Sequence, residues 1–160
     1  MFKKKKIKST DKVWRSAEEK ANGIANDISA YLAADQQVFL FYYFEETGRE
    51  LVDILTAKGT DFTELDKANR GSKVILVCAK ELKSSSRMID ALRKFSNPDK
   101  SAFLFSNHYP KYYFELEVLE ELMHLHDEVI ECCFYVSMDE PLMRVFGSER
   151  IMAIIDKMGY

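Results

Sequence analysis

The stretch QVFLFYYF at residues 37–44 decides the fold. After its first residue it contains only aromatic and aliphatic side chains, with no alternation of polar and apolar positions. A strand that is apolar on both sides has to be covered on both faces, which is the usual situation in parallel sheets with helices on either side. The stretch therefore predicts an α/β domain built around a parallel sheet.

Strands and helices alternate along the rest of the chain. Apolar runs bounded by polar residues predict the other strands: residues 62–65, 73–79, 102–106 and 129–136. Apolar residues three or four positions apart predict the helices: residues 13–32, 47–58, 86–96, 113–126 and 148–158. Strands joined in this way pair in parallel, with helices on both faces of the sheet. We therefore predict a three-layer α/β sandwich with a mostly parallel sheet.

Length and composition agree with one folded domain that follows a short arm. The chain has 160 residues, of which 47% are hydrophobic and 31% are charged. A single core usually occupies roughly 100 to 200 residues, so we expect one domain over residues 12–160. Residues 1–11 contain a cluster of lysines and little apolar material, and we expect them to form a flexible basic arm.

Targeting and charge point to a soluble compartment. The arm lacks the apolar core of a signal peptide, and no apolar run approaches the roughly 20 residues that cross a bilayer. We therefore expect a cytoplasmic protein without stable membrane insertion. The formal net charge of −3 gives no overall basic field that would attract nucleic acid.

No cofactor or metal site is expected. Cys78, Cys132 and Cys133 lie in apolar runs, and adjacent strand residues point to opposite faces, so Cys132 and Cys133 cannot act as a CxxC-type site. Glu120 and His124 are one helical turn apart, but no further ligand is fixed beside them. We expect reduced, buried thiols, and histidines that form ion pairs or cap helices.

Polar side chains follow the predicted strands. In open α/β sheets, ligands bind beyond the carboxyl ends of the strands. Ten residues lie at such positions: Tyr43, Glu45, Lys80, Ser85, Arg87, Asn107, His108, Tyr109, Ser137 and Asp139. We expect them to converge on one edge of the sheet as candidates for binding a ligand or a partner, with no catalytic group among them. The alternative is that several of them only cap helices or close turns.

The chain carries more aromatic side chains than one small core needs. It has 11 phenylalanines and eight tyrosines, and many of them fall in residues 39–44 and 109–114. Aromatic residues are enriched in protein interfaces. We expect part of this set to form a surface for another protein.

The last predicted strand continues as FYVSMDEPLMRVFGSERI at residues 134–151. This segment resembles the pattern "FYLSLED-LMR-FGSERI" that closes the second motor domain of SecA, the ATPase that drives proteins through the bacterial translocon. The order of elements is similar further back, through residues 45–59 and 103–110. The resemblance implies a RecA-like fold of the P-loop NTPase type, as a stand-alone, degenerate relative of that domain.

The motifs of a working motor are absent from the sequence. The chain has no GxxxxGK[ST] loop for nucleotide phosphates. SecA carries a "GRxGRQGDxGSS" block before its terminal strand, whereas residues 126–133 read HDEVIECC. The SecA segment "TNMAGRGTDI" has no counterpart either, since residues 78–86 read CAKELKSSS. Phosphoryl transfer relies on such groups for positioning and charge stabilisation, so we expect no ATPase activity and no enzyme.

The resemblance implies a non-catalytic module that binds or regulates another protein and is connected with protein export. Two alternatives stay open. The strand-end edge could bind a small ligand or a nucleotide, which would raise thermal stability when the ligand is added. The lysine-rich arm could bind nucleic acid on a helicase-like fold, which would make retention on DNA or RNA sensitive to salt.

Overall fold

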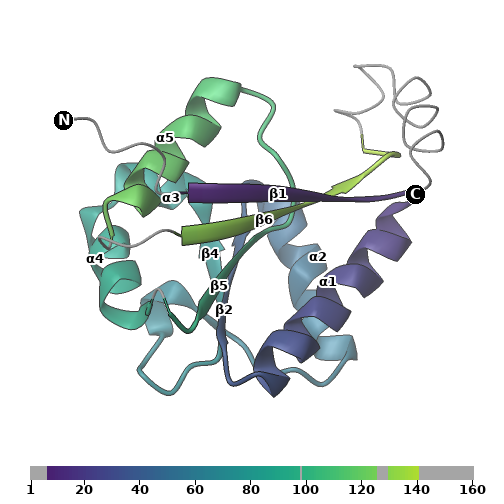
Figure 1. Cartoon of the computed structure of the whole chain (residues 1–160), viewed down its shortest axis with the longest axis horizontal. Coiled ribbons are helices and arrows are strands. Elements are labelled where there is room, and N and C mark those ends of the chain that lie inside the picture. The colour runs from purple at the N-terminus through teal and green to yellow at the C-terminus, as the bar shows by residue number, and fades with distance from the viewer. Residues whose placement is uncertain (1–6, 98, 126–129, 141–160) are drawn as a thin grey trace.

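Six parallel strands form one sheet in the computed structural model, which describes residues 7–97, 99–125 and 130–140. The strands are β1 (Ile7–Trp14), β2 (Gln37–Tyr42), β3 (Thr63–Glu64), β4 (Val74–Cys78), β5 (Ser101–Phe105) and β6 (Ile130–Ser137). Their order across the sheet is β1-β6-β5-β2-β4-β3, and every pair is parallel. Figure 1 shows β1 and β6 side by side at one edge. The predicted α/β fold with a mostly parallel sheet is confirmed.

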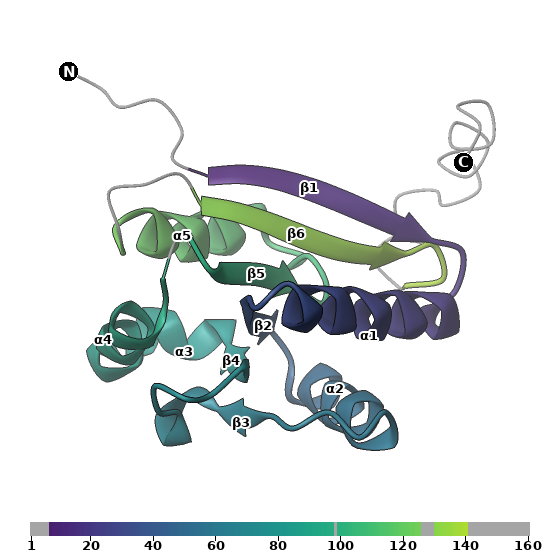
Figure 2. The same cartoon turned by 60° about the horizontal axis from the view of Figure 1, so that its bottom comes forward.

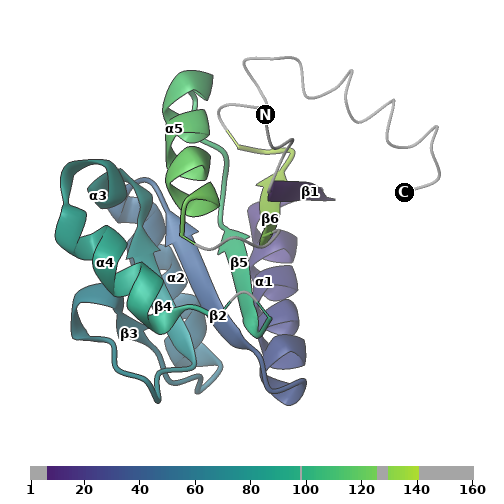
Figure 3. The same cartoon turned by 60° about the vertical axis from the view of Figure 1, so that its left-hand side comes forward.

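Helices cover both faces of this sheet. They are α1 (Ala17–Ala33), α2 (Glu45–Ala57), α3 (Ala79–Ser84), α4 (Ser86–Phe95) and α5 (Tyr112–Met123), with a 3-10 turn η1 (Leu65–Lys67) before β4. The helices α1 and α2 pack on one face, and α3, α4 and α5 pack on the other. Figures 2 and 3 show these three layers from two directions.

The strand β2 contributes to the core on both faces. Val38 and Leu40 pack with the residues of α1 and α2, whereas Phe39 and Phe41 pack with those of α3, α4 and α5. All four side chains are fully buried. The uninterrupted apolar run of this strand is therefore explained by a helix layer on each side, as predicted.

Stacked phenylalanines join the central strands on the face of α5. The ring of Phe105 lies between those of Phe41 and Phe134, with centroid distances of 4.4 and 4.6 Å. Phe39 stacks on Phe103 at 5.5 Å. Offset stacking of this kind adds stability beyond the burial of the rings. Much of the aromatic excess in the sequence is therefore used inside the core.

The predicted boundary between arm and domain is wrong for residues 7–11. These residues belong to β1, which pairs with β6 from Ile7 opposite Ile130 to Trp14 opposite Ser137. Their polar side chains gave no strand pattern because β1 is an edge strand, exposed on most of its length. The first helix begins at Ala17 and not at residue 13. Residues 1–6 lie outside the described residues.

Two further differences concern the ends of predicted elements. The six-residue helix α3 was not predicted, because residues 79–84 are too few to show a helical period. The predicted helix at 148–158 lies outside the described residues. Cys132 and Cys133 face opposite sides of β6 as free thiols, which confirms that prediction. Burial raises the pKa of the Cys132 thiol to about 12.

No helix within the described ranges has the length and apolar character needed to span a membrane.

A glycine lets α1 pack closely on β1. Gly23 is buried, and a methyl group at this position would lie 2.7 Å from Cε2 of Trp14. We expect Gly23→Ala to lower the free energy of unfolding by about 1–3 kcal/mol and to change the emission of Trp14, because the indole has to move. Trp14 is the one tryptophan of the chain, so fluorescence reports this site alone. Asn22→Ala, on the exposed side of the same helix turn, should change neither quantity.

Candidate functional site

The carboxyl ends of the strands meet at one edge, because the sheet is entirely parallel. The ten predicted residues do not form one site there. They fall into a histidine group on α5, an aromatic group between β2 and β5, a capping group at the start of α1, and several separate positions. The contacts within each group show what its members do.

His108, which follows β5, bridges two carboxylates. Its Nδ1 lies 2.7 Å from Oε1 of Glu115 on α5, and its Nε2 lies 3.0 Å from Oδ1 of Asp11 on β1. The ring also stacks on Phe134 of β6, with a centroid distance of 4.3 Å and an interplanar angle of 3°. His108 therefore ties α5 to two strands at the edge of the sheet. We call His108, Asp11 and Glu115 the histidine bridge.

The histidine bridge is charged at neutral pH. Burial alone would lower the pKa of His108, but its hydrogen bonds to Asp11 and Glu115 raise this pKa to about 9. The side chain of Glu115 is only 7% exposed, so the imidazolium supplies its compensating charge. Both ring nitrogens are used by separate carboxylates, which makes the group a chain of ion pairs. Within the described residues, no cluster of histidine, cysteine or acidic side chains could hold a metal ion.

An aromatic group lies next to the histidine bridge. Tyr109 packs on Tyr43 at 5.1 Å, on Phe44 at 5.5 Å and on Phe114 at 4.8 Å between ring centroids. The ammonium group of Lys80 lies 4.6 Å from the centre of the Phe44 ring. A lysine over an aromatic face is attracted by the ring quadrupole. Tyr43, Tyr109 and Lys80 are thus brought together, as predicted, but they contact each other.

The hydroxyl of Tyr43 is an exception within this group. It is buried and has no hydrogen-bond partner among residues 7–97, 99–125 and 130–140. Burial, followed by the nearby Glu115, raises the pKa of Tyr43 far above its ordinary value. The phenol therefore stays neutral and serves the core.

Ser137 and Asp139 belong to the capping group. Oδ2 of Asp139 accepts a hydrogen bond from the backbone N–H of Ala17 at 3.1 Å, which places a negative charge at the start of α1. Oε1 of Glu140 accepts bonds from the N–H and the hydroxyl of Ser137 at 3.1 and 3.2 Å. Glu140 also pairs with Lys20 of α1. These polar groups fix α1 to the end of β6.

The remaining predicted residues lie apart from these groups. Ser85 is the N-cap of α4, where its Oγ accepts from the N–H of Met88 at 3.4 Å, and Arg87 is exposed in the first turn of that helix. Glu45 is exposed in the first turn of α2. Oδ1 of Asn107 lies 3.2 Å from the hydroxyl of Ser106. The alternative of helix capping is therefore correct for Ser85 and Asp139.

Sequence reasoning missed the partners of His108. Asp11 was assigned to the flexible arm, and Glu115 was not considered because the apolar face of α5 was placed on Tyr113, Leu116 and their helical neighbours. The buried residues of α5 are Glu115, Val118 and Leu122. An acidic residue in step with Val118 and Leu122 was the available signal, because a buried carboxylate needs a partner.

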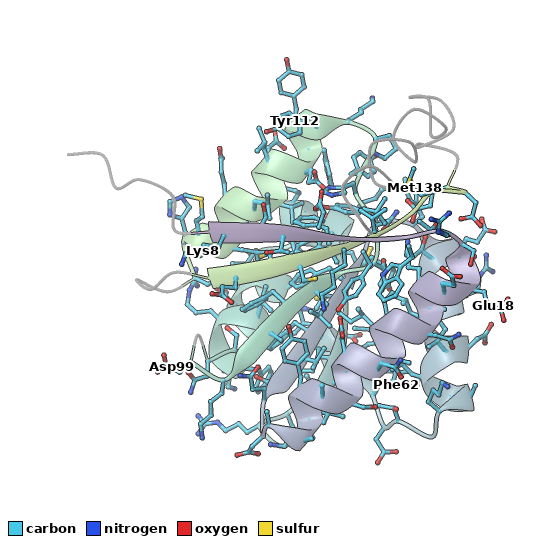
Figure 4. All side chains as sticks on the ribbon, turned by 45° about the vertical axis from the view of Figure 1, so that its right-hand side comes forward. Lys8, Glu18, Phe62, Asp99, Tyr112 and Met138 are labelled. Carbon is cyan, nitrogen blue, oxygen red and sulfur yellow. The ribbon has the colours of Figure 1, made fainter. Side chains whose placement is uncertain are left out.

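The helix α5 therefore turns apolar side chains toward solvent. Tyr112 is 65% exposed, Tyr113 is 82% exposed and Leu116 is 37% exposed. They lie within one turn of the helix, since residues three or four apart share a side. Figure 4 shows Tyr112 projecting away from the protein at the end of α5. We call Tyr112, Tyr113 and Leu116 the α5 patch.

Comparisons with known proteins give short or weak likenesses. No protein-family model matches the chain. Thirty residues, 19% of the chain, are 53% identical to the protein translocase subunit SecA of Chlorobaculum tepidum and 50% identical to SecA 1 of Chlorobium chlorochromatii. A SecA of Chlorobium phaeobacteroides matches at 53% over the same length. These matches span 3% of each SecA chain. The resemblance to SecA is confirmed for a short segment.

A solved structure is also similar in part. It is a chain from a crystal structure of fission yeast Ccq1 and Tpz1, with 15% identity and a TM-score of 0.36. The likeness covers 63% of this chain and 33% of the other. No argument is based on a likeness of this size.

Proposed function

We propose that this domain is a non-catalytic, SecA-related module that binds another protein through the α5 patch and acts in connection with protein export. Three exposed apolar side chains on one helix turn carry this proposal. Tyrosine supplies a large contact area with few rotatable bonds, and tyrosines are frequent among the residues that dominate binding energy. The patch is bordered by exposed polar residues, Lys111 and Glu117, as in a protein interface with a polar rim.

The strand-end edge supports the same proposal, because its polar groups are already bonded to one another. His108 holds Asp11 and Glu115, and Glu140 holds Lys20 and Ser137. A nucleotide at this edge would have to break these contacts and compensate their loss. The absence of glycine-rich and arginine-rich motor motifs from the sequence points in the same direction.

The connection with protein export rests on the short SecA likeness alone. Similarity over 30 residues supports common ancestry of a segment, and a segment does not carry the activity of a whole motor. We therefore assign the domain a binding role in that process and no step of the motor cycle.

A comparison of wild-type protein with a patch variant tests the proposal. The variant combines Tyr112→Ser with Tyr113→Ser, which removes both rings from solvent-exposed positions and should leave the free energy of unfolding within about 0.5 kcal/mol. Affinity purification from the native cell, with quantitative mass spectrometry, should recover a component of the export machinery with the wild-type protein. Recovery with the variant should fall at least about tenfold, the effect of losing about 1.4 kcal/mol of binding free energy.

Two results would contradict the proposal. One is equal recovery of the same partner by the wild-type protein and the patch variant, which would place the contact elsewhere. The other is recovery of no export component at all. Stabilisation of the domain by ATP or ADP in a thermal-shift measurement would favour the nucleotide-binding alternative.

A further inference from the structure

The edge strand β1 has one row of backbone groups that no described residue pairs with. The carbonyl of Trp14 accepts from the N–H of Met138 at 2.9 Å, so the backbone of Trp14 points toward β6. Backbone groups alternate between the two sides of a strand, and Lys8, Thr10 and Lys12 therefore bond to β6 as Trp14 does. The N–H and C=O groups of Ser9, Asp11 and Val13 point away from the sheet. Such an open edge is a template for another strand.

A groove lies beside this edge on the face of α1. It has a volume of about 520 Å³ and runs over the first halves of β1, β6 and β5, where α1 does not cover the sheet. Lys8, Thr10 and Lys12 form its wall on β1, and Tyr31 of α1 closes its other side. Side chains of an added strand would stand next to this row of β1, because directly opposite residues have Cβ atoms about 5 Å apart. The groove thus offers room for alternate side chains of an extended peptide.

The charges on β1 select the kind of strand that can be added. Lys8 and Lys12 are on the groove face, and both are exposed. The one acidic residue of the strand, Asp11, is on the other face and is compensated by His108. In an antiparallel pair of two β1 strands around Thr10, Lys8 would stand opposite Lys12, and this repulsion disfavours a second copy of the chain. An acidic strand meets attraction instead.

We propose that the open edge of β1 binds an extended, acidic segment of a partner protein as a seventh strand. Its backbone bonds to the outward groups of Ser9, Asp11 and Val13, and its carboxylates lie along Lys8 and Lys12. On the opposite face, an apolar side chain fits next to Val13, which is 43% exposed. The inference rests on the proposed protein-binding role and names a second surface, distinct from the α5 patch.

Binding of a designed peptide tests this inference. The probe is an eight-residue, end-capped and fluorescein-labelled peptide in which glutamate alternates with threonine or valine, and the matched control carries lysine at the glutamate positions. Fluorescence anisotropy of the whole chain should show saturable binding of the glutamate probe that weakens as salt increases, since the contacts with Lys8 are exposed. The lysine control should bind at least about tenfold more weakly.

Two variants separate edge pairing from attraction by charge. Ser9→Pro removes an outward N–H and leaves the ladder to β6 intact, and it should weaken binding of the glutamate probe at least about tenfold. Ser9→Ala keeps the N–H and should bind as the wild type does. Lys8→Glu keeps every backbone group and should weaken the glutamate probe while improving the lysine control. It gives a readout even where Ser9→Pro disturbs the fold, which circular dichroism would reveal.

The inference is overturned by the absence of saturable binding, by equal binding of the two probes, or by Lys8→Glu binding as the wild type does. Unchanged binding by a folded Ser9→Pro variant also overturns it. The variant Tyr112→Ser with Tyr113→Ser should bind the glutamate probe normally. Loss at the edge with an intact α5 patch, or the reverse, therefore identifies which of the two surfaces has failed.

Discussion

Replacing His108 by glutamine is expected to lower the free energy of unfolding by about 2–3 kcal/mol at neutral pH. Glutamine can donate one hydrogen bond to Glu115, but it carries no charge. The variant therefore leaves a carboxylate that is 7% exposed without its cation, and it also loses the bond to Asp11 and the stacking on Phe134. Urea unfolding followed by circular dichroism measures the change. His124→Gln, at an exposed position that ends α5, should alter it by less than about 0.5 kcal/mol.

The pH dependence of stability gives this prediction a second readout. The pKa of His108 is raised to about 9 in the folded protein, above its ordinary value of 6.5. A raised pKa means that the stabilisation is complete below pH 6.5 and is lost as the pH rises through 9. The difference corresponds to at most about 3 kcal/mol, and about 2 is expected because Asp11 is 54% exposed. The wild type should lose this amount between pH 6.5 and 9 relative to the variant. Parallel curves would show that His108 carries no such charge.

Replacing Phe105 by alanine is expected to have the largest effect on stability, about 3–5 kcal/mol. The ring is fully buried between Phe41 and Phe134 and also contacts Tyr43, so its removal leaves a cavity among three strands. A loss of this size is a large part of the stability of a typical domain, which is about 5–15 kcal/mol. The fluorescence of Trp14 and circular dichroism should show the same urea midpoint, shifted to lower concentration.

An exposed aromatic residue provides the control for this substitution. Tyr113→Ala removes a ring that is 82% exposed and should change the free energy of unfolding by less than about 0.5 kcal/mol. A cost at Phe105 no greater than that at Tyr113 would contradict the stacked core and the three-layer arrangement around it.

The buried strands could be predicted from the sequence, and the edge strand could not. The apolar runs of β2, β4, β5 and β6 follow from burial by helices on both faces. In contrast, β1 is held by backbone pairing with β6, and backbone pairing leaves no hydrophobic period. Lysine, serine and aspartate in β1 protect an open edge and therefore look like a solvated arm.

The candidate site could be predicted only as a set of positions. The rule for strand ends correctly placed His108, Tyr109 and Tyr43 at one edge, because it depends on topology alone. It could not show that Asp11 and Glu115 occupy both nitrogens of His108, since these residues are far apart in the sequence. The exposure of Tyr113 follows from the same contact, which turns Glu115 inward and rotates the apolar residues of α5 toward solvent.

Photo-crosslinking in the native cell tests the proposed protein-binding role most directly. A benzophenone amino acid placed at Tyr113 in the α5 patch should form a crosslink to a component of the export machinery. The same group at Asn26, exposed on α1 across the sheet, should not. A crosslink from position 113 that is absent from position 26 is the result we expect. Equal crosslinking from both positions, or no crosslink to an export component from position 113, would contradict a binding role for the α5 patch.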